Sequence, residues 1–269
     1  MPRLLTAGRA AALIVGIVCL VALSAGAIAP GNPFAMSRDV LRPPSSRHPF
    51  GTDDLGRDLF RAVVHGTRAS LVIAAGTAVA AVALGTLIGG TAGAAGGVAD
   101  EVLMRLTELF QVVPRFFLTL AAAAIIGSGL GTLTVLLGLT SWTTIARTVR
   151  GQVLSIRELD HVVAARAAGA SPARVLARHI LPLTVEPVIA LASLQASGAI
   201  IIEAGVSFLG LGDPTVMTWG ALLHDGHHLL RVAWWTAVFP GAALTVTVLA
   251  IHLLADEFSD LRTSAASGV

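Results

Sequence analysis

Lysine and tyrosine are absent from this 269-residue chain, so all 18 of its Lys-plus-Arg positions are arginines. A Walker A loop requires Gly-Lys-Ser/Thr, so this chain cannot bind ATP through such a loop. Charged residues are also scarce, at 13% of the chain compared with about 25% in soluble globular proteins. Together with a mean hydropathy of +0.80, this scarcity predicts a polytopic membrane protein.

Other classes of protein are disfavoured by what is missing. The single cysteine, Cys19, excludes an internal disulfide, and its apolar surroundings predict a small buried side chain. The net charge is only +2 and the arginines are spread along the chain, so we expect no binding of nucleic acid. No Gly-x-Ser-x-Gly or His-Glu-x-x-His motif is present, so we expect no enzyme activity and no cofactor in this chain.

Six apolar stretches predict an all-α protein with six transmembrane helices. We expect residues 1–68 to hold the first transmembrane helix and an extracytoplasmic segment, residues 69–255 to form a five-helix core, and residues 256–269 to form a cytoplasmic tail. The N-terminal stretch also has features of a cleaved signal peptide, but the further spans favour an uncleaved helix. The predicted spans are about 10–29, 69–98, 114–127, 130–149, 183–204 and 232–254.

Glycines recur every four residues in the second span, at positions 85, 89, 93 and 97, and predict a face against which another helix packs closely. Before this span, residues 57–65 predict a short amphipathic helix at the membrane surface. Asp53, Asp54 and Asp58 are interpreted as turn and N-cap residues rather than cation ligands. After the span, residues 100–115 form a short charged segment with helical periodicity and one proline.

A basic segment at residues 151–182 predicts two short capped helices. A capping box begins at Ser155, and Gly169 suits the left-handed position that ends a helix. Ser171 and Pro172 then provide the N-cap and first position of a second helix. An abrupt corner of this kind predicts a compact docking element at a membrane surface.

This segment resembles the EAA loop of ABC-importer permeases through Ala164-Ala165, Gly169 and Ile180-Leu181-Pro182. In that family the loop docks on a separate ATPase subunit. Val163 stands where the family pattern has Glu. The resemblance implies that ATPase coupling involves Val163, Ala164, Ala165, Arg166, Ala168, Gly169, Ala170 and Ser171.

Two further segments resemble one permease subunit of dipeptide and oligopeptide importers. Residues 48–71 contain His-Pro-Phe-Gly-Thr-Asp, Gly-Arg-Asp and Gly-x-Arg-x-Ser-Leu, and residues 207–220 contain Ser-Phe-Leu-Gly-Leu-Gly and then Trp-Gly. The resemblance implies the type I ABC-importer permease fold and membrane-lipid surroundings. The implied partners are a second homologous permease, an extracytoplasmic substrate-binding protein, and one or more cytoplasmic ATPase subunits that hold ATP and Mg²⁺.

Di- or oligopeptides are the substrates that this resemblance favours, with nickel or another small solute as the alternative. A secondary transporter that needs no ATPase is a rival interpretation. Such transporters carry acids or paired broken helices in mid-membrane, whereas the predicted spans here contain almost no Asp or Glu.

In the segment 203–220, glycines and a proline are expected to interrupt the helix at membrane depth. Non-helical backbone at that depth is tolerated only where protein or a water-filled cavity covers it. The segment is therefore predicted to border the translocation path. Glu203 is either a path residue or an interfacial acid paired with an arginine of the partner subunit. The candidates for the path or outer gate are Glu203, Ser207, Phe208, Leu209 and Trp219.

Three histidines, His224, His227 and His228, have spacing compatible with a metal site, but surface histidines are the preferred interpretation. Six spans place both termini on one side, and the positive-inside rule supports the cytoplasm for that side. The resemblance to the EAA loop decides this orientation, because an ATPase partner must be cytoplasmic, and it implies the plasma membrane of a prokaryote. Six arginines between residues 38 and 68 would then lie outside, and the acids of that longer segment partly balance them.

Overall fold

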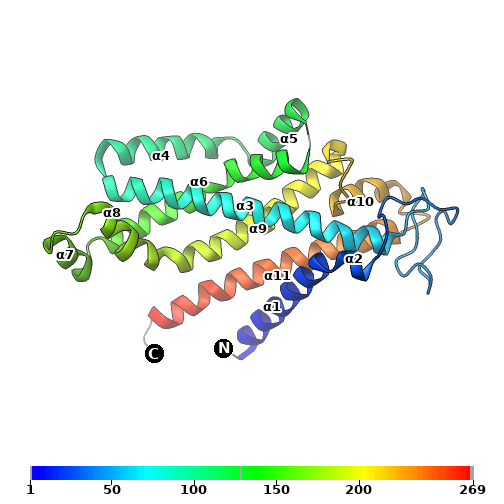
Figure 1. Ribbon diagram of the computed structural model, residues 1–269, viewed down its shortest axis with the longest axis horizontal. Coiled ribbons are helices and arrows are strands. Elements are labelled where there is room, and N and C mark those ends of the chain that lie inside the picture. Colours follow the sequence, from blue (N-terminus) through cyan, green and yellow to red (C-terminus); the bar gives the residue numbers. More distant parts are fainter. Residues whose placement is uncertain (1, 128, 267–269) are drawn as a thin grey trace.

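The computed structural model describes residues 2–127 and 129–266, which form a bundle of long helices that run along one axis (Figure 1). Within these ranges there is no β-strand, only an isolated antiparallel bridge between Thr52 and Asp58. The helices are α1 (Pro2–Leu23), α2 (Ala25–Ile28), α3 (Leu59–Ala95), α4 (Gly97–Val112), α5 (Arg115–Ile126), α6 (Leu130–Ile156), α7 (Asp160–Ala167), α8 (Pro172–Val175), η1 (Leu176–Ile180), η2 (Leu181–Thr184), α9 (Val185–Val206), η3 (Ser207–Leu211), α10 (Trp219–Gly226), η4 (His227–Leu229) and α11 (Trp235–Ala266).

By length and composition, three helical segments of the described chain can cross a membrane: Leu59–Ala95, Pro172–Leu211 and Trp235–Glu257. The bent pair α4 and α5 counts as a fourth if it is one span, and Gly8–Leu23 is a shorter apolar helix. The predicted stretch 130–149 is α6, which is 27 residues long but rich in hydroxyl side chains. The chain is therefore an all-helical membrane protein, as predicted, although hydropathy alone does not select all six predicted spans.

The charged segment at 100–115 is helical, as its periodicity predicts: it forms most of α4, which is followed after a sharp bend by α5. The two axes differ by 78°, and the break falls at Pro114, which cannot donate a backbone hydrogen bond. Asp100 does not face water as a loop residue would. Its carboxylate accepts a bidentate pair of hydrogen bonds from Arg150 of α6, with 2.6 Å between Arg150 Nη2 and Asp100 Oδ2. This ion pair explains how charged residues fit into the bundle.

The separate surface helix predicted at 57–65 does not exist, because α3 runs without interruption from Leu59. Asp58 caps its N-terminus and accepts a hydrogen bond from the Arg61 amide. The first turns are buried: Leu59 and Ala62 lie in an apolar cluster with Trp219 and other side chains. At 37 residues, α3 is about 55 Å long and extends well beyond a hydrocarbon core about 30 Å thick.

The glycine face of α3 packs directly against α6. A Cβ atom at Gly89 would lie 2.2 Å from the carbonyl oxygen of Ala146, and one at Gly85 would lie 2.6 Å from Cβ of Ile145. Gly93 makes a similar approach to Val153, whereas Gly97 opens α4 and has no neighbour within 4 Å. The predicted packing face is thus confirmed for three of its four glycines.

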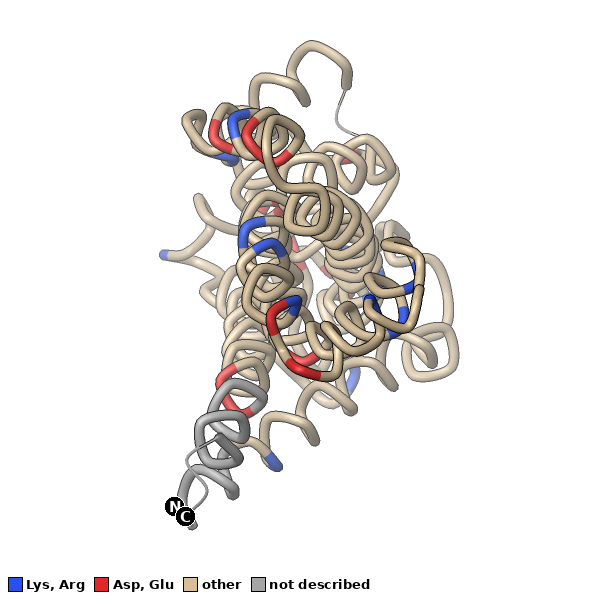
Figure 2. Tube along the Cα trace, turned by 90° about the vertical axis from the view of Figure 1, so that its left-hand side faces the viewer, with Lys and Arg blue, Asp and Glu red and all other residues tan. Residues whose placement is uncertain are grey.

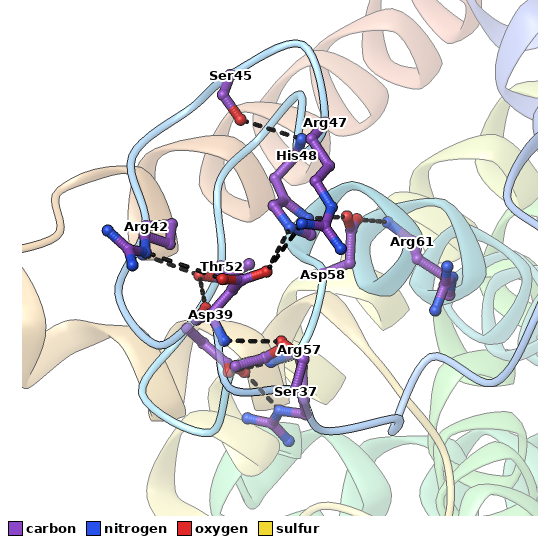
Figure 3. A network of polar contacts seen from close by, with 12 residues as sticks. Ser37, Asp39, Arg42, Ser45, Arg47, His48, Thr52, Arg57, Asp58 and Arg61 are labelled. Atoms are coloured by element: carbon purple, nitrogen blue, oxygen red, sulfur yellow. Dashed lines mark hydrogen bonds and ion pairs between the residues drawn. The ribbon is translucent and has the colours of Figure 1, made fainter.

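Residues 29–58, here called the cap, form a non-helical segment folded over the end of the bundle that lies opposite α7 (Figure 1). A polar network holds the cap together (Figure 3): His48 Nδ1 lies 2.7 Å from Asp58 Oδ2, and Asp53 accepts from the Leu55 and Arg57 amides. The indole of Trp235 donates to the Thr52 carbonyl oxygen at 3.0 Å and fastens the cap to α11. The aspartates thus serve as turn and cap residues, as predicted.

The prediction that Cys19 is buried is wrong, because the side chain is exposed on α1. This helix packs against α11 and α3 on one side only, so its other side faces outward. Apolar side chains on that side include Leu13 and Leu20, which are 66% and 64% exposed. In a membrane protein such a surface contacts lipid.

Candidate functional site

The segment that resembles an EAA loop forms a projecting knob, defined here as residues 160–180 (α7, α8 and η1), at one end of the bundle (Figure 1). The knob is attached through Val162, Val175 and Ile180, which are at most 2% exposed and lie in one cluster with Ile145 and Val149 of α6. Its predicted coupling residues lie outward instead: all are exposed except Ala165 and Ala170, which are half-buried. The knob is therefore anchored by buried apolar side chains and presents a surface of small residues and arginines.

The corner of the knob has the predicted geometry. Gly169 has a φ of +85°, a left-handed conformation that follows the end of α7. Ser171 then caps α8 by accepting a hydrogen bond from the Arg174 amide, with Pro172 in the first helical turn. The predicted capping box at Ser155 is wrong, because α6 continues through that residue to Ile156.

A half-open hollow of about 280 Å³ lies between the knob and the end of α3. Arg157 and Arg166 contribute to its lining, together with Ala94, Ala170, Pro172, Val175, Leu176 and Ile180. Figure 2 looks along the bundle from the knob end and shows arginine and acidic positions close together on the segments nearest the viewer. Two of the predicted coupling residues, Arg166 and Ala170, therefore line this hollow.

The broken segment after α9 divides the predicted path residues into two groups. Glu203 is 1% exposed and accepts a hydrogen bond from the Ser207 hydroxyl at 2.7 Å, while its Oε2 atom is buried without a hydrogen-bond partner in the described chain. Phe208 and Leu209 face outward, with 41% and 55% of their surface exposed. The break occurs at Gly210, whose φ of +82° ends the helical conformation.

Trp219 does not share a surface with these residues. It is 1% exposed, and its indole donates a hydrogen bond to the Val63 carbonyl oxygen of α3 at 3.1 Å. Its neighbour Gly220 lies so close to α9 that a Cβ atom there would be 2.6 Å from Ala204 Cα. The Trp-Gly pair therefore fastens α10 to α3 and α9.

The three histidines lie in α10 and η4. The Nδ1 atoms of His224 and His227 lie 2.7 Å and 2.6 Å from backbone carbonyl oxygens, so both act as donors there. The ring centroids of His227 and His228 are 5.0 Å apart and nearly perpendicular. Among the described residues, no group of three His, Cys, Asp or Glu side chains has an arrangement that could hold a metal ion.

The structure also reveals a polar cluster that the sequence prediction missed. Arg115, the first residue of α5, donates hydrogen bonds from Nη1 to Ser141 Oγ of α6 at 3.0 Å and to Gln195 Oε1 of α9 at 2.5 Å. Ser141 and Gln195 are buried, at 2% and 7% exposure. An arginine within an apolar stretch and a glutamine inside a predicted span were the available signals.

A second missed contact joins the cap to α10. Arg57 donates from Nη2 to Asp225 Oδ2 at 2.6 Å and also pairs with Asp53. Burial alone would lower the pKa of the Arg57 guanidinium, but hydrogen bonds to Asp225 and Asp53 outweigh burial and raise this pKa. Arg57 therefore remains charged and ties the cap to the segment that follows the broken helix.

Comparison with known proteins gives this arrangement a context. Curated relatives include a putative peptide permease protein of Brucella suis, 39% identical over 81% of this chain and 73% of the relative, and the dipeptide transport system permease protein of Bacillus subtilis, 36% identical over 85% and 75%. Among solved structures, the MetNI methionine ABC transporter in inward-facing conformations has a chain with a TM-score of 0.59. That match covers 72% of this chain and 93% of the transporter chain at 18% identity, so it shows the fold alone.

Residues 81–261 match the family model described as the inner membrane component of binding-protein-dependent transport systems. This range extends from the glycine face of α3 through the knob and the broken segment into α11. More than half of the chain is matched, and the relatives are aligned over most of both sequences. The chain thus belongs to the family of inner membrane permease components of binding-protein-dependent transport systems.

Proposed function

We propose that this chain is the permease subunit of an ATP-driven importer of di- or oligopeptides and forms half of the translocation path. The observation that carries the proposal is the knob, an exposed surface of small residues anchored to the bundle by buried valines. The names of the curated relatives, a putative peptide permease and a dipeptide transport permease, favour peptides as the cargo.

The partners follow from what the chain contains and lacks. Without lysine it cannot carry a Walker A loop, so ATP and Mg²⁺ bind to a separate ATPase, which docks on the knob. A second homologous permease completes the path, and a substrate-binding protein delivers peptide on the opposite side.

This arrangement places the knob and both termini in the cytoplasm and the cap outside. The N-terminal end of α1 and the C-terminal end of α11 lie toward the knob end of the bundle, away from the cap, in support of this orientation (Figure 1). The positive-inside rule disfavours arginines on the outer side. Two of the cap arginines are paired with acids. Arg57 pairs with Asp53 and Asp225, and Arg47 lies 3.6 Å from Asp39.

Coupling in this proposal is mechanical. The knob connects α6 directly to α9 through η1 and η2, and its buried residues pack against α6. A movement of the ATPase therefore shifts the inner ends of both helices together, because a closely packed cluster transmits displacement. At the other end of α9, Glu203 and Ser207 are proposed to border the path, with Phe208 and Leu209 facing it or the second permease.

The test is the substitution Gly169→Val. A β-branched residue at a φ of +85° is strained, although no atom lies within 4 Å of the site to clash with its Cβ. The corner therefore changes shape while the bundle stays intact. We expect peptide uptake to fall at least tenfold while the complex still hydrolyses ATP.

Gly131→Val is the matched control. Gly131 also has no neighbour within 4 Å, but it lies near the outer end of α6 and has no positive φ. Uptake should stay within about twofold of the unmodified complex. Normal uptake and normal peptide-stimulated hydrolysis in Gly169→Val would refute docking at this corner, and peptide uptake without any ATPase would refute the ATP-driven mechanism.

A further inference from the structure

The bend between α4 and α5 carries a cation without a matching anion. Arg115 forms no ion pair with any carboxylate of the described chain. Among the described residues, its hydrogen bonds go to two neutral acceptors, the Ser141 hydroxyl and the Gln195 amide oxygen, and both use Nη1. By contrast, Arg150 of the same bundle has a bidentate carboxylate partner in Asp100.

The contacts of this cation lie well inside the ends of two long helices of the bundle. Ser141 is 11 residues from the start of α6, which corresponds to about 16 Å along the helix. Gln195 is ten residues from the start of the 22-residue α9, or about 15 Å. Measured from the helix starts, both values are close to half of a hydrocarbon core about 30 Å thick, so the contacts fall within a membrane-spanning length. A charged side chain at that depth is costly and marks a functional pathway by default.

The free part of the guanidinium is open to a ligand. Nε and Nη2 of Arg115 make no hydrogen bond in the described chain, and neither is among its buried unpartnered atoms. Nη2 lies 3.7 Å from the position that a Cβ atom on Gly198 of α9 would occupy. The absence of a side chain at Gly198 leaves room beside this edge of the guanidinium. Two N–H groups on one edge fit a carboxylate, which accepts two parallel hydrogen bonds.

We propose that Arg115, positioned by Ser141 and Gln195, binds the carboxylate of the transported peptide as it passes the bend. The inference rests on the proposed peptide-import function, because every unmodified peptide has a terminal carboxylate. Holding the arginine with neutral groups leaves its charge available, whereas a built-in acid would neutralise it. A passing substrate therefore supplies the missing anion only for the time that it occupies the site.

The experiment compares a library of tripeptides with the same library as C-terminal amides. Uptake is measured in membrane vesicles that contain the complete complex with an unchanged binding protein. A charge-assisted bidentate contact predicts that Arg115→Gln lowers uptake of the free acids about tenfold or more, with much less effect on the amides. Arg115→Lys should restore part of the uptake of the acids, because it keeps the charge but loses the planar fork.

Arg105→Gln is the control for loss of a positive charge on the same bent pair of helices, α4 and α5. Arg105 is 72% exposed and pairs with Glu108 in α4, away from the polar cluster. Its substitution should leave the ratio of acid to amide uptake unchanged.

An equal loss of acid and amide uptake in Arg115→Gln would overturn the inference. Loss of the second permease from the purified complex would also overturn it, since the missing anion would then be an acid of that subunit. If the unmodified complex imports neither library in the presence of ATP, the peptide-import function itself fails.

Discussion

The close contact between α3 and α6 offers a sharp test of the packing argument at Gly89. A methyl group added there would place its carbon 2.2 Å from the Ala146 carbonyl oxygen and 2.9 Å from two further backbone atoms of that residue. Ordinary carbon–oxygen contacts are about 1 Å longer, so Gly89→Ala must push the two helices apart. Overpacking of this kind typically costs about 1–3 kcal/mol. The neighbouring contacts at Gly85 and Gly93 would be lost with it.

The control is the adjacent residue of the same helix. A Cβ atom at Gly90 would meet only side-chain atoms of Leu181 and Leu176, at 3.5 Å and 3.9 Å. Both substitutions add the same methyl group, and both make the helix more favourable by about 1 kcal/mol, because alanine has a higher helix propensity than glycine. We expect Gly90→Ala to keep or slightly raise the melting temperature.

The assay is thermal unfolding of the purified protein in detergent. For a chain of this size each kcal/mol corresponds to roughly 2–4 °C, so Gly89→Ala should melt about 2–12 °C below Gly90→Ala, which has the same gain in helix propensity. Equal melting temperatures for the Gly89 and Gly90 variants would refute the backbone-to-backbone approach of the two helices.

Two further predictions concern the polar contacts outside the spans. Asp213 accepts a hydrogen bond from the Leu130 amide at the start of α6. Its hydrogen bonds outweigh burial and lower its pKa, so its stabilising effect is present at neutral pH and is lost as the pH falls through this lowered pKa. Asp213→Asn should therefore melt below the unmodified protein at pH 7, with a gap that closes in acid; a constant gap would contradict this role. Asp225→Asn removes one charged partner of the buried Arg57 guanidinium and should speed hydrogen exchange in the cap several-fold, as measured by mass spectrometry. Asp54 is exposed, so Asp54→Asn should leave the exchange rate unchanged.

The corner of the knob was predictable because its signals are local. Gly169 at a left-handed φ and Ser171 with Pro172 at a helix start depend only on neighbouring residues. The capping box at Ser155 failed for the opposite reason. The same Ser-x-x-Glu pattern fits inside a continuing helix, and the buried Val153 and Ile156 extend α6 past it.

The continuity of α3 was likewise decided by distant residues. Residues 57–65 have the pattern of a surface helix, and nothing local shows that they continue into the span. Leu59 and Ala62 are buried because Trp219 and Trp235, more than 150 positions away, pack over them. The failed prediction for Cys19 has a related origin, since an apolar run does not reveal which of its sides other helices cover.

Motif resemblance predicted the permease family. The sequence by itself determined a helical membrane protein with no Walker A loop, a sharp corner at Gly169 and a broken segment after α9. These features follow from hydropathy, from missing lysine and from short-range backbone preferences. Only the tertiary structure decided which polar groups meet. Arg115, Ser141 and Gln195 come from three separate helices, and Arg57 meets Asp225 across 168 positions. Such meetings depend on how helices pack, and no short-range pattern in a single sequence encodes them.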